Sequence, residues 1–110
     1  MYKIGELSRL SKISVKTLRY YDNEGILMPD YIDDFTGYRY YDAAKLSDCY
    51  RIIALKELGF SLNEIKDAFL LPKDRFSELL LSKEQELNQL KKQTEYRIGI
   101  LRNLNTAIKE

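Results

Sequence analysis

The 110-residue sequence lacks the residues from which most active sites and metal sites are built. It has no histidine and a single cysteine, Cys49. One cysteine cannot form a disulfide within the chain, and without histidine the usual His- or multi-Cys metal sites of a single chain are excluded. No glycine-rich phosphate loop and no HExxH or GxSxG motif occurs. We therefore expect no enzyme, no metal site and no cofactor.

The sequence also has no long hydrophobic run. No apolar stretch approaches the ~18–20 residues that a membrane-spanning helix needs. The N-terminus has no basic segment followed by an apolar core, which is the pattern of a secretory signal peptide. These absences predict a cytoplasmic protein.

An excess of charge of one sign is missing as well, but the cations are unevenly distributed. The formal net charge is only +1, so the overall composition does not indicate a nucleic-acid-binding protein. Residues 1–21 nevertheless contain five cations and one carboxylate, Glu6. The cations of this segment are Lys3, Arg9, Lys12, Lys16 and Arg19. Positive charge is thus concentrated at the N-terminal end.

The segment from Ser11 to Gly25 is typical of the turn and second helix of a helix-turn-helix. Ser14 occupies an N-cap position, and Gly25 follows the point where the helix should end. Val15, Leu18 and Tyr21 share one face at helical spacing. The opposite face carries Lys12, Lys16, Arg19, Tyr20 and Asn23. Cations, a phenol and an amide can contact phosphate oxygens and base edges in a major groove; the alternative is an ordinary solvated helix.

An amphipathic segment over residues 4–11 predicts the first helix of this motif, with residues 12–14 as the turn. The side chains expected to pack between the two helices are Ile4, Leu7, Ile13, Val15 and Leu18. Two helices within about 20 residues have the length and layout of a helix-turn-helix.

Residues 31–41 predict a β-hairpin, because aromatic and β-branched residues flank a loop that ends at Gly37. A hairpin after a helix-turn-helix is a wing. Tyr38 and Arg39 at its tip can reach a phosphate or a neighbouring groove. We expect Tyr40 or Tyr41 to pack against the helices; the alternative is that all of these tyrosines are packing residues.

Two further helices are expected after the wing. Asp42 is the predicted N-cap of a helix over residues 43–58, which Gly59 closes. Its apolar stripe contains Leu46, Cys49, Tyr50, Ile53 and Leu58. Cys49 on that stripe is interpreted as a small buried hydrophobe rather than a reactive thiol. Ser61 and Glu64 form a capping box that begins a helix over residues 62–70.

Residues 73–109 contain no proline and predict one helix of ~55 Å. A heptad pattern gives an apolar seam of Phe76, Leu80, Leu87, Leu90, Leu101, Leu104 and Ile108. Lys83, Thr94 and Arg97 interrupt it and should fix its register. A small preceding domain cannot cover so long a seam, so we expect a coiled coil with a second copy; the alternative is packing within the chain. The expected domains are residues 1–71, which bind DNA, and 72–110, which dimerise.

Several of these segments resemble one family in chain order. The matching segments are residues 2–8, 15–22 (Val-Lys-Thr-Leu-Arg-Tyr-Tyr-Asp), 25–29, 36–41 (Thr-Gly-Tyr-Arg-Tyr-Tyr) and 58–65. Together they resemble the N-terminal half of MerR-family transcriptional regulators, and the wing is most similar to the multidrug-responsive branch typified by BmrR and TipA. The resemblance implies a mainly α fold: a winged helix-turn-helix and a long helix that forms an antiparallel coiled coil between protomers.

The resemblance also implies a mechanism and site residues. Such homodimers bind a pseudo-palindromic promoter spacer in double-stranded DNA and distort it for RNA polymerase. The positions that match the DNA-contacting ones are Lys16, Thr17, Arg19 and Tyr20 in the recognition helix, Tyr38 and Arg39 in the wing, and Lys56 near a second backbone contact. Drug-sensing members continue into a domain that binds a small-molecule inducer. This sequence stops at Glu110, so we expect a fragment. The rival hypothesis is a coiled-coil interaction module whose winged-helix domain docks a protein.

Overall fold

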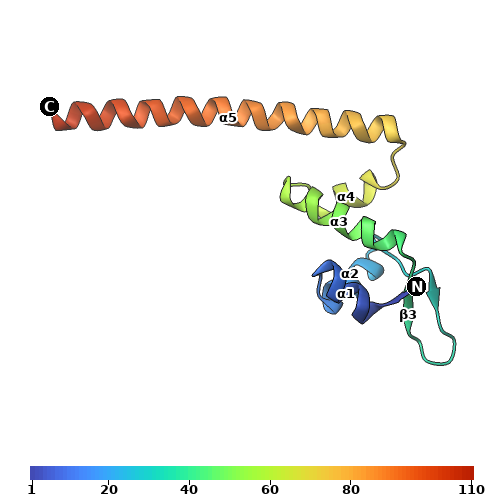
Figure 1. Ribbon diagram of the computed structural model, residues 1–110. Helices are drawn as coiled ribbons and strands as arrows, with labels where there is room; N and C mark the ends of the chain where they lie inside the picture. The colour runs from blue at the N-terminus through green and yellow to red at the C-terminus, as the bar shows by residue number, and fades with distance from the viewer. The chain divides into compact units, whose positions relative to one another are not determined.

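A computed structural model describes all residues of the chain, 1–110 (Figure 1). The chain divides into two compact units, Met1–Leu70 and Leu71–Glu110. The first contains three strands and four helices, and the second is a single helix.

The helix-turn-helix forms as predicted, from α1 (Ile4–Ser11) and α2 (Val15–Asn23). Ser14 caps α2, because its Oγ accepts a hydrogen bond from the Thr17 backbone N–H at 3.1 Å. Gly25 follows α2 with a φ of 71°, the left-handed conformation expected there. The end of α1 was not foreseen: Lys12 adopts the left-handed conformation, with a φ of 67°.

The wing is a sheet of three strands, one more than predicted. β2 (Tyr31–Ile32) and β3 (Arg39–Tyr41) form the expected antiparallel hairpin, and Gly37 has a φ of 71° in its loop. β1 (Tyr2–Lys3) pairs with the other edge of β3, with Tyr2 opposite Tyr41. The order β1-β3-β2 places the chain's first residues beside the wing (Figure 1).

The third helix, α3 (Ala44–Glu57), corrects two expectations. Asp42 is not its N-cap. Ala43 holds that position, and the Asp42 N–H instead donates to Asp30 Oδ2 at 2.8 Å. This contact with the preceding loop fixes Asp42 before the helix begins.

The second correction concerns the buried face of α3. Cys49 is buried, as predicted, but Tyr50, Ile53 and Leu58 are exposed, and the buried neighbours of Cys49 along the helix are Ile52 and Leu55. Helical spacing is compatible with more than one choice of apolar face, and packing against α1 and α4 buries the face of Ile52 and Leu55 instead of the predicted one.

The fourth helix, α4 (Leu62–Ala68), begins with the predicted capping box. Glu64 N–H donates to Ser61 Oγ at 3.2 Å, and Ser61 N–H donates to Glu64 Oε1 at 2.9 Å. The helix ends two residues before the predicted limit. Phe60 and Ile65, which flank the cap, are both buried.

The second unit is α5 (Lys73–Lys109), which follows Pro72 and has no buried residue. Its predicted seam residues Leu87, Leu101 and Ile108 are exposed within the single chain. None of the helices combines the length and apolar content that crossing a bilayer requires.

Candidate nucleic-acid interface

The two faces of α2 differ as the sequence predicted. Leu18 and Tyr21 are buried, while Lys16, Arg19 and Tyr20 are exposed. Thr17 is partly buried in the first turn, where its Oγ1 accepts a hydrogen bond from Ser14 Oγ at 2.9 Å. The capped first turn thus orients the side chains expected to face DNA.

A partly buried ion pair fixes the wing to α2. Arg39 Nε lies 2.8 Å from Asp22 Oδ2, and the two side chains are 33% and 18% exposed. Because both groups are partly buried, this charge-assisted bond holds β3 on the end of α2 more firmly than a fully exposed pair would. Arg39 therefore has a positioning role within the fold. Asp22 was missed as a site residue, since nothing in the sequence links it to a partner 17 positions away.

Strand β1 brings a further cation to the wing. Lys3 Nζ lies 5.5 Å from the centroid of the Tyr38 ring, within cation–π range. The Tyr38 backbone N–H donates to Thr36 Oγ1 at 3.1 Å, which orders the loop before it.

Asp33 orders the other side of this loop. Its Oδ1 accepts hydrogen bonds from the N–H groups of Phe35 at 2.8 Å and Thr36 at 3.0 Å. These two backbone bonds lower the pKa of the exposed Asp33 carboxyl, so it stays ionised in the turn.

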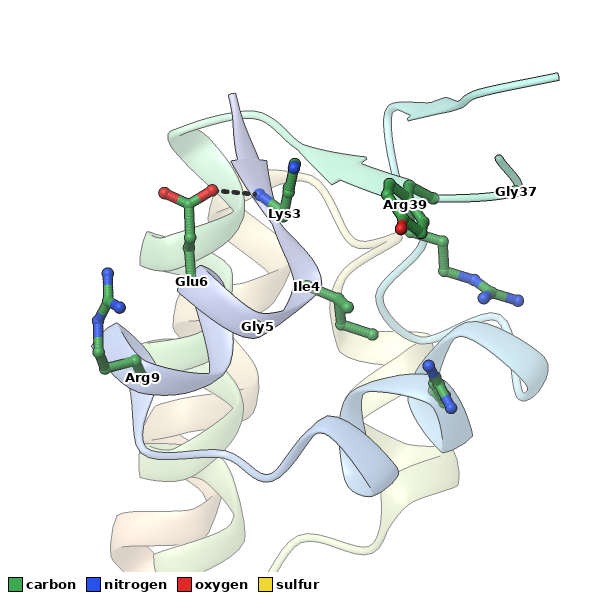
Figure 2. Close-up of a pocket in the computed structure, with 9 residues that line it drawn as sticks. Lys3, Ile4, Gly5, Glu6, Arg9, Gly37 and Arg39 are labelled. Atoms are coloured by element: carbon green, nitrogen blue, oxygen red, sulfur yellow. Dashed lines mark hydrogen bonds between the residues drawn. The ribbon is translucent and has the colours of Figure 1, made fainter. Parts of the chain in front are cut away.

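A groove of about 610 Å³ joins the recognition helix to the wing (Figure 2). Its lining residues are Lys3, Ile4, Gly5, Glu6, Arg9, Arg19, Gly37, Tyr38 and Arg39. Arg19 from α2 and the wing residues Tyr38 and Arg39, predicted separately, therefore border one concave surface. Sequence reasoning did not single out Lys3, Gly5 or Arg9 as site residues, because their membership depends on the pairing of β1 with β3.

Lys56 lies at a second hollow, of about 470 Å³, on another side of α2. Lys12, Thr17 and Lys56 share this hollow with Ile13, Ser14, Tyr21, Ile53 and Glu57. The last turns of α3 thus lie beside the helix-turn-helix turn. The structure brings Lys56 to the N-terminal end of α2, whereas Tyr38 and Arg39 lie at the other groove.

Two buried titratable groups lie behind this surface. Burial raises the pKa of Tyr41, and the nearby Asp22 charge raises it further; no protein group bonds to its hydroxyl. Burial also raises the pKa of the Cys49 thiol, partly offset by a hydrogen bond with Ser11. Cys49 is therefore a protonated packing residue.

Comparisons with known proteins agree with this architecture. The family model described as "MerR HTH family regulatory protein" matches residues 2–70. The Multidrug-efflux transporter 1 regulator of Bacillus subtilis is 36% identical over 88 residues, which are 80% of this chain and 32% of that protein. This chain thus spans about a third of the length of that relative.

Two solved structures extend the similarity to α5. The crystal structure of MtaN, the N-terminus of the Bacillus subtilis multidrug transporter activator, has a TM-score of 0.80 at 31% identity, covering 94% of this chain and 96% of that one. EcmrR in its cryo-EM complex with DNA has a TM-score of 0.69 at 30% identity, covering 99% of this chain and 40% of that one.

Proposed function

Because the chain belongs to the MerR family of helix-turn-helix regulatory proteins, we propose that it is a sequence-specific, DNA-binding transcription regulator that acts as a homodimer. The observation that carries this proposal is the exposed cationic face of α2, which shares a groove with the wing. Nearly the same fold is found in EcmrR, which is described in complex with DNA.

In the proposed complex, α2 enters the major groove and the wing lies over the adjoining backbone. Lys16, Arg19 and Tyr20 contact base edges and nearby phosphates from the exposed face of α2. Thr17 contacts DNA from the capped first turn of the same helix. Tyr38 and Arg39 contact the backbone from the wing, and Arg39 also holds the wing on α2 through Asp22. Lys56, near the N-terminal end of α2, contacts a phosphate on the far side of the same DNA major groove.

The homodimer is proposed to form through α5. The helix exposes leucines along its predicted seam, including Leu80, Leu90 and Leu104. A second copy, packed antiparallel, would cover that seam and set two α2 helices on one duplex. The proposed target is a pseudo-palindromic promoter spacer that the dimer distorts for RNA polymerase. The signal proposed for this regulator is a small-molecule inducer.

The proposal is tested with a duplex selected by the unmodified chain from a randomised library. We expect its affinity to fall linearly with the logarithm of salt concentration, as counterions are released from phosphates. Arg19→Ala should weaken binding by about 1–3 kcal/mol and relax specificity at one base pair, because a base-reading guanidinium is lost. Competitive fluorescence anisotropy with single-base variants of the duplex measures both effects.

Arg102→Ala is the matched control, since it removes the same group from α5 and should leave DNA affinity unchanged. Unchanged affinity in Arg19→Ala would show that α2 does not read DNA. Salt-insensitive binding to a protein, with no selected duplex, would favour the rival interaction module.

A further inference from the structure

We propose that the groove between α1 and the wing is a seat for the DNA sugar–phosphate backbone, with Lys3 and Arg9 as additional phosphate contacts. The inference rests on the proposed function, because its ligand is the duplex that α2 reads. It adds a third element, the β1–α1 junction, to the recognition helix and the wing.

The charges of the groove favour an anion. Its lining contains four cations, Lys3, Arg9, Arg19 and Arg39, and one carboxylate. That carboxylate, Glu6, accepts a hydrogen bond from the Lys3 backbone N–H at 3.0 Å, so it is held at the start of α1 (Figure 2). Asp22 offsets the charge of Arg39. Lys3, Arg9 and Arg19 therefore give the groove its positive potential.

The position of the groove selects DNA over a small anion. Arg19 on α2 and Tyr38 on the wing lie at its border, so a strand that contacts both must pass across it. Lys3 is already placed over the Tyr38 ring, with 5.5 Å between Nζ and the ring centroid. A cation ordered before binding loses less side-chain entropy when it contacts a phosphate.

Gly5 provides an independent observation. It lies in the first turn of α1 and lines the groove, yet a Cβ built there would meet no atom within 4 Å. Its φ is not in the left-handed region, so neither the backbone nor the packing of this chain requires glycine. Glycine inside a helix is less stable than alanine. The missing side chain leaves room for a close approach from outside the chain, as a sugar–phosphate strand would make.

The first test uses Gly5→Ala, which should separate folding from binding. We expect its melting temperature to stay equal or rise, since alanine favours the helix. Affinity for the selected duplex should fall about tenfold, the equivalent of one lost charge-assisted contact. Thermal unfolding by circular dichroism and anisotropy titrations of the same preparation measure both.

The second test uses Lys3→Ala, which should lower affinity for selected and random duplexes alike. The slope of log K against log salt should become shallower by about 1, the signature of one lost phosphate contact. Lys3→Arg should restore the slope. Lys92→Ala removes one ammonium group from α5, outside the groove, and should not change it. In an ethylation-interference experiment, one phosphate per half-site should stop interfering with binding in Lys3→Ala but not in Lys92→Ala.

The outcomes separate this inference from the proposed function. If the unmodified chain selects no duplex, the proposed function fails. If it selects one, and both Gly5→Ala and Lys3→Ala bind with unchanged affinity and slope, the groove does not hold DNA and only this inference fails. Inorganic phosphate added at constant ionic strength should not compete; competition that Lys3→Ala abolishes would make the groove a small-anion site and overturn the inference.

Discussion

Single side chains decide how the wing is held against the recognition helix. The Arg39–Asp22 pair joins β3 to the end of α2 with an N···O distance of 2.8 Å. Tyr41, also on β3, lies behind this pair with its ring 0% exposed. Its hydroxyl is buried and no protein group accepts its proton. The contact between the wing and α2 thus contains one well-paired ion pair and one buried hydroxyl without a partner.

Tyr41→Phe tests the unpaired group. Removing a buried hydroxyl that makes no hydrogen bond should leave the free energy of unfolding equal or raise it by about 1 kcal/mol. Burial raises the pKa of Tyr41, so the folded chain holds this proton more tightly than the unfolded chain. That difference costs stability as pH rises through the ordinary tyrosine pKa of about 10. The variant should therefore lose less stability above that pH.

Urea unfolding at neutral and alkaline pH measures both effects. Tyr38→Phe, which changes an exposed tyrosine of the same wing, is the control and should be neutral. A clear destabilisation by Tyr41→Phe would mean that its hydroxyl has a bonding partner in solution.

At the scale of helices and strands, local hydrogen bonds determine most boundaries. Ser14 and the Ser61–Glu64 box start α2 and α4 with bonds that span three residues. The end of α1 is an exception, because Lys12 takes the left-handed conformation usually given to glycine. In α5, by contrast, a glycine, Gly99, lies in the middle of a long helix.

Gly99→Ala tests whether that glycine is needed. A Cβ at Gly99 would meet no atom within 4 Å, and the residue lies opposite the predicted seam. We expect the helix to gain roughly 1 kcal/mol, because alanine is the better helix former. Circular dichroism and analytical ultracentrifugation measure helix stability and dimer affinity together. A weaker dimer would instead mean that Gly99 faces the partner helix and that the predicted seam is on the wrong face of α5.

At the scale of the whole molecule, the main prediction is the assembly of two chains through α5. Leu87 is 43% exposed in the single chain and Leu81 is 57% exposed. In a monomer, replacing either leucine by alanine should therefore have similar effects. In the proposed coiled coil, Leu87 lies in the seam and Leu81 lies outside it.

Leu87→Ala should weaken the dimer by about 2–5 kcal/mol for each buried leucine removed. Leu81→Ala is the matched control and should leave it intact. Sedimentation equilibrium across a concentration series measures the change. Equal behaviour of the two variants, or a monomeric unmodified chain at micromolar concentration, would contradict the proposed seam and with it the proposed pairing of two α2 helices.

The sequence by itself determined the features that depend on neighbours along the chain. The cap at Ser14, the turn glycines Gly25 and Gly37, the capping box at Ser61 and the bounds of α5 were all predicted, because each arises from bonds or conformational preferences within a few residues. The DNA-contacting and dimerising residues stay predictions.

Only the tertiary structure decided which distant segments meet. It paired β1 with β3, bonded Asp22 to Arg39, held Asp42 on Asp30 instead of on α3, and selected the buried face of α3. The groove with Lys3, Gly5 and Arg9 follows from these contacts. Their partners lie too far apart in the chain for periodicity or spacing to link them, since such pairings depend on how the whole core packs.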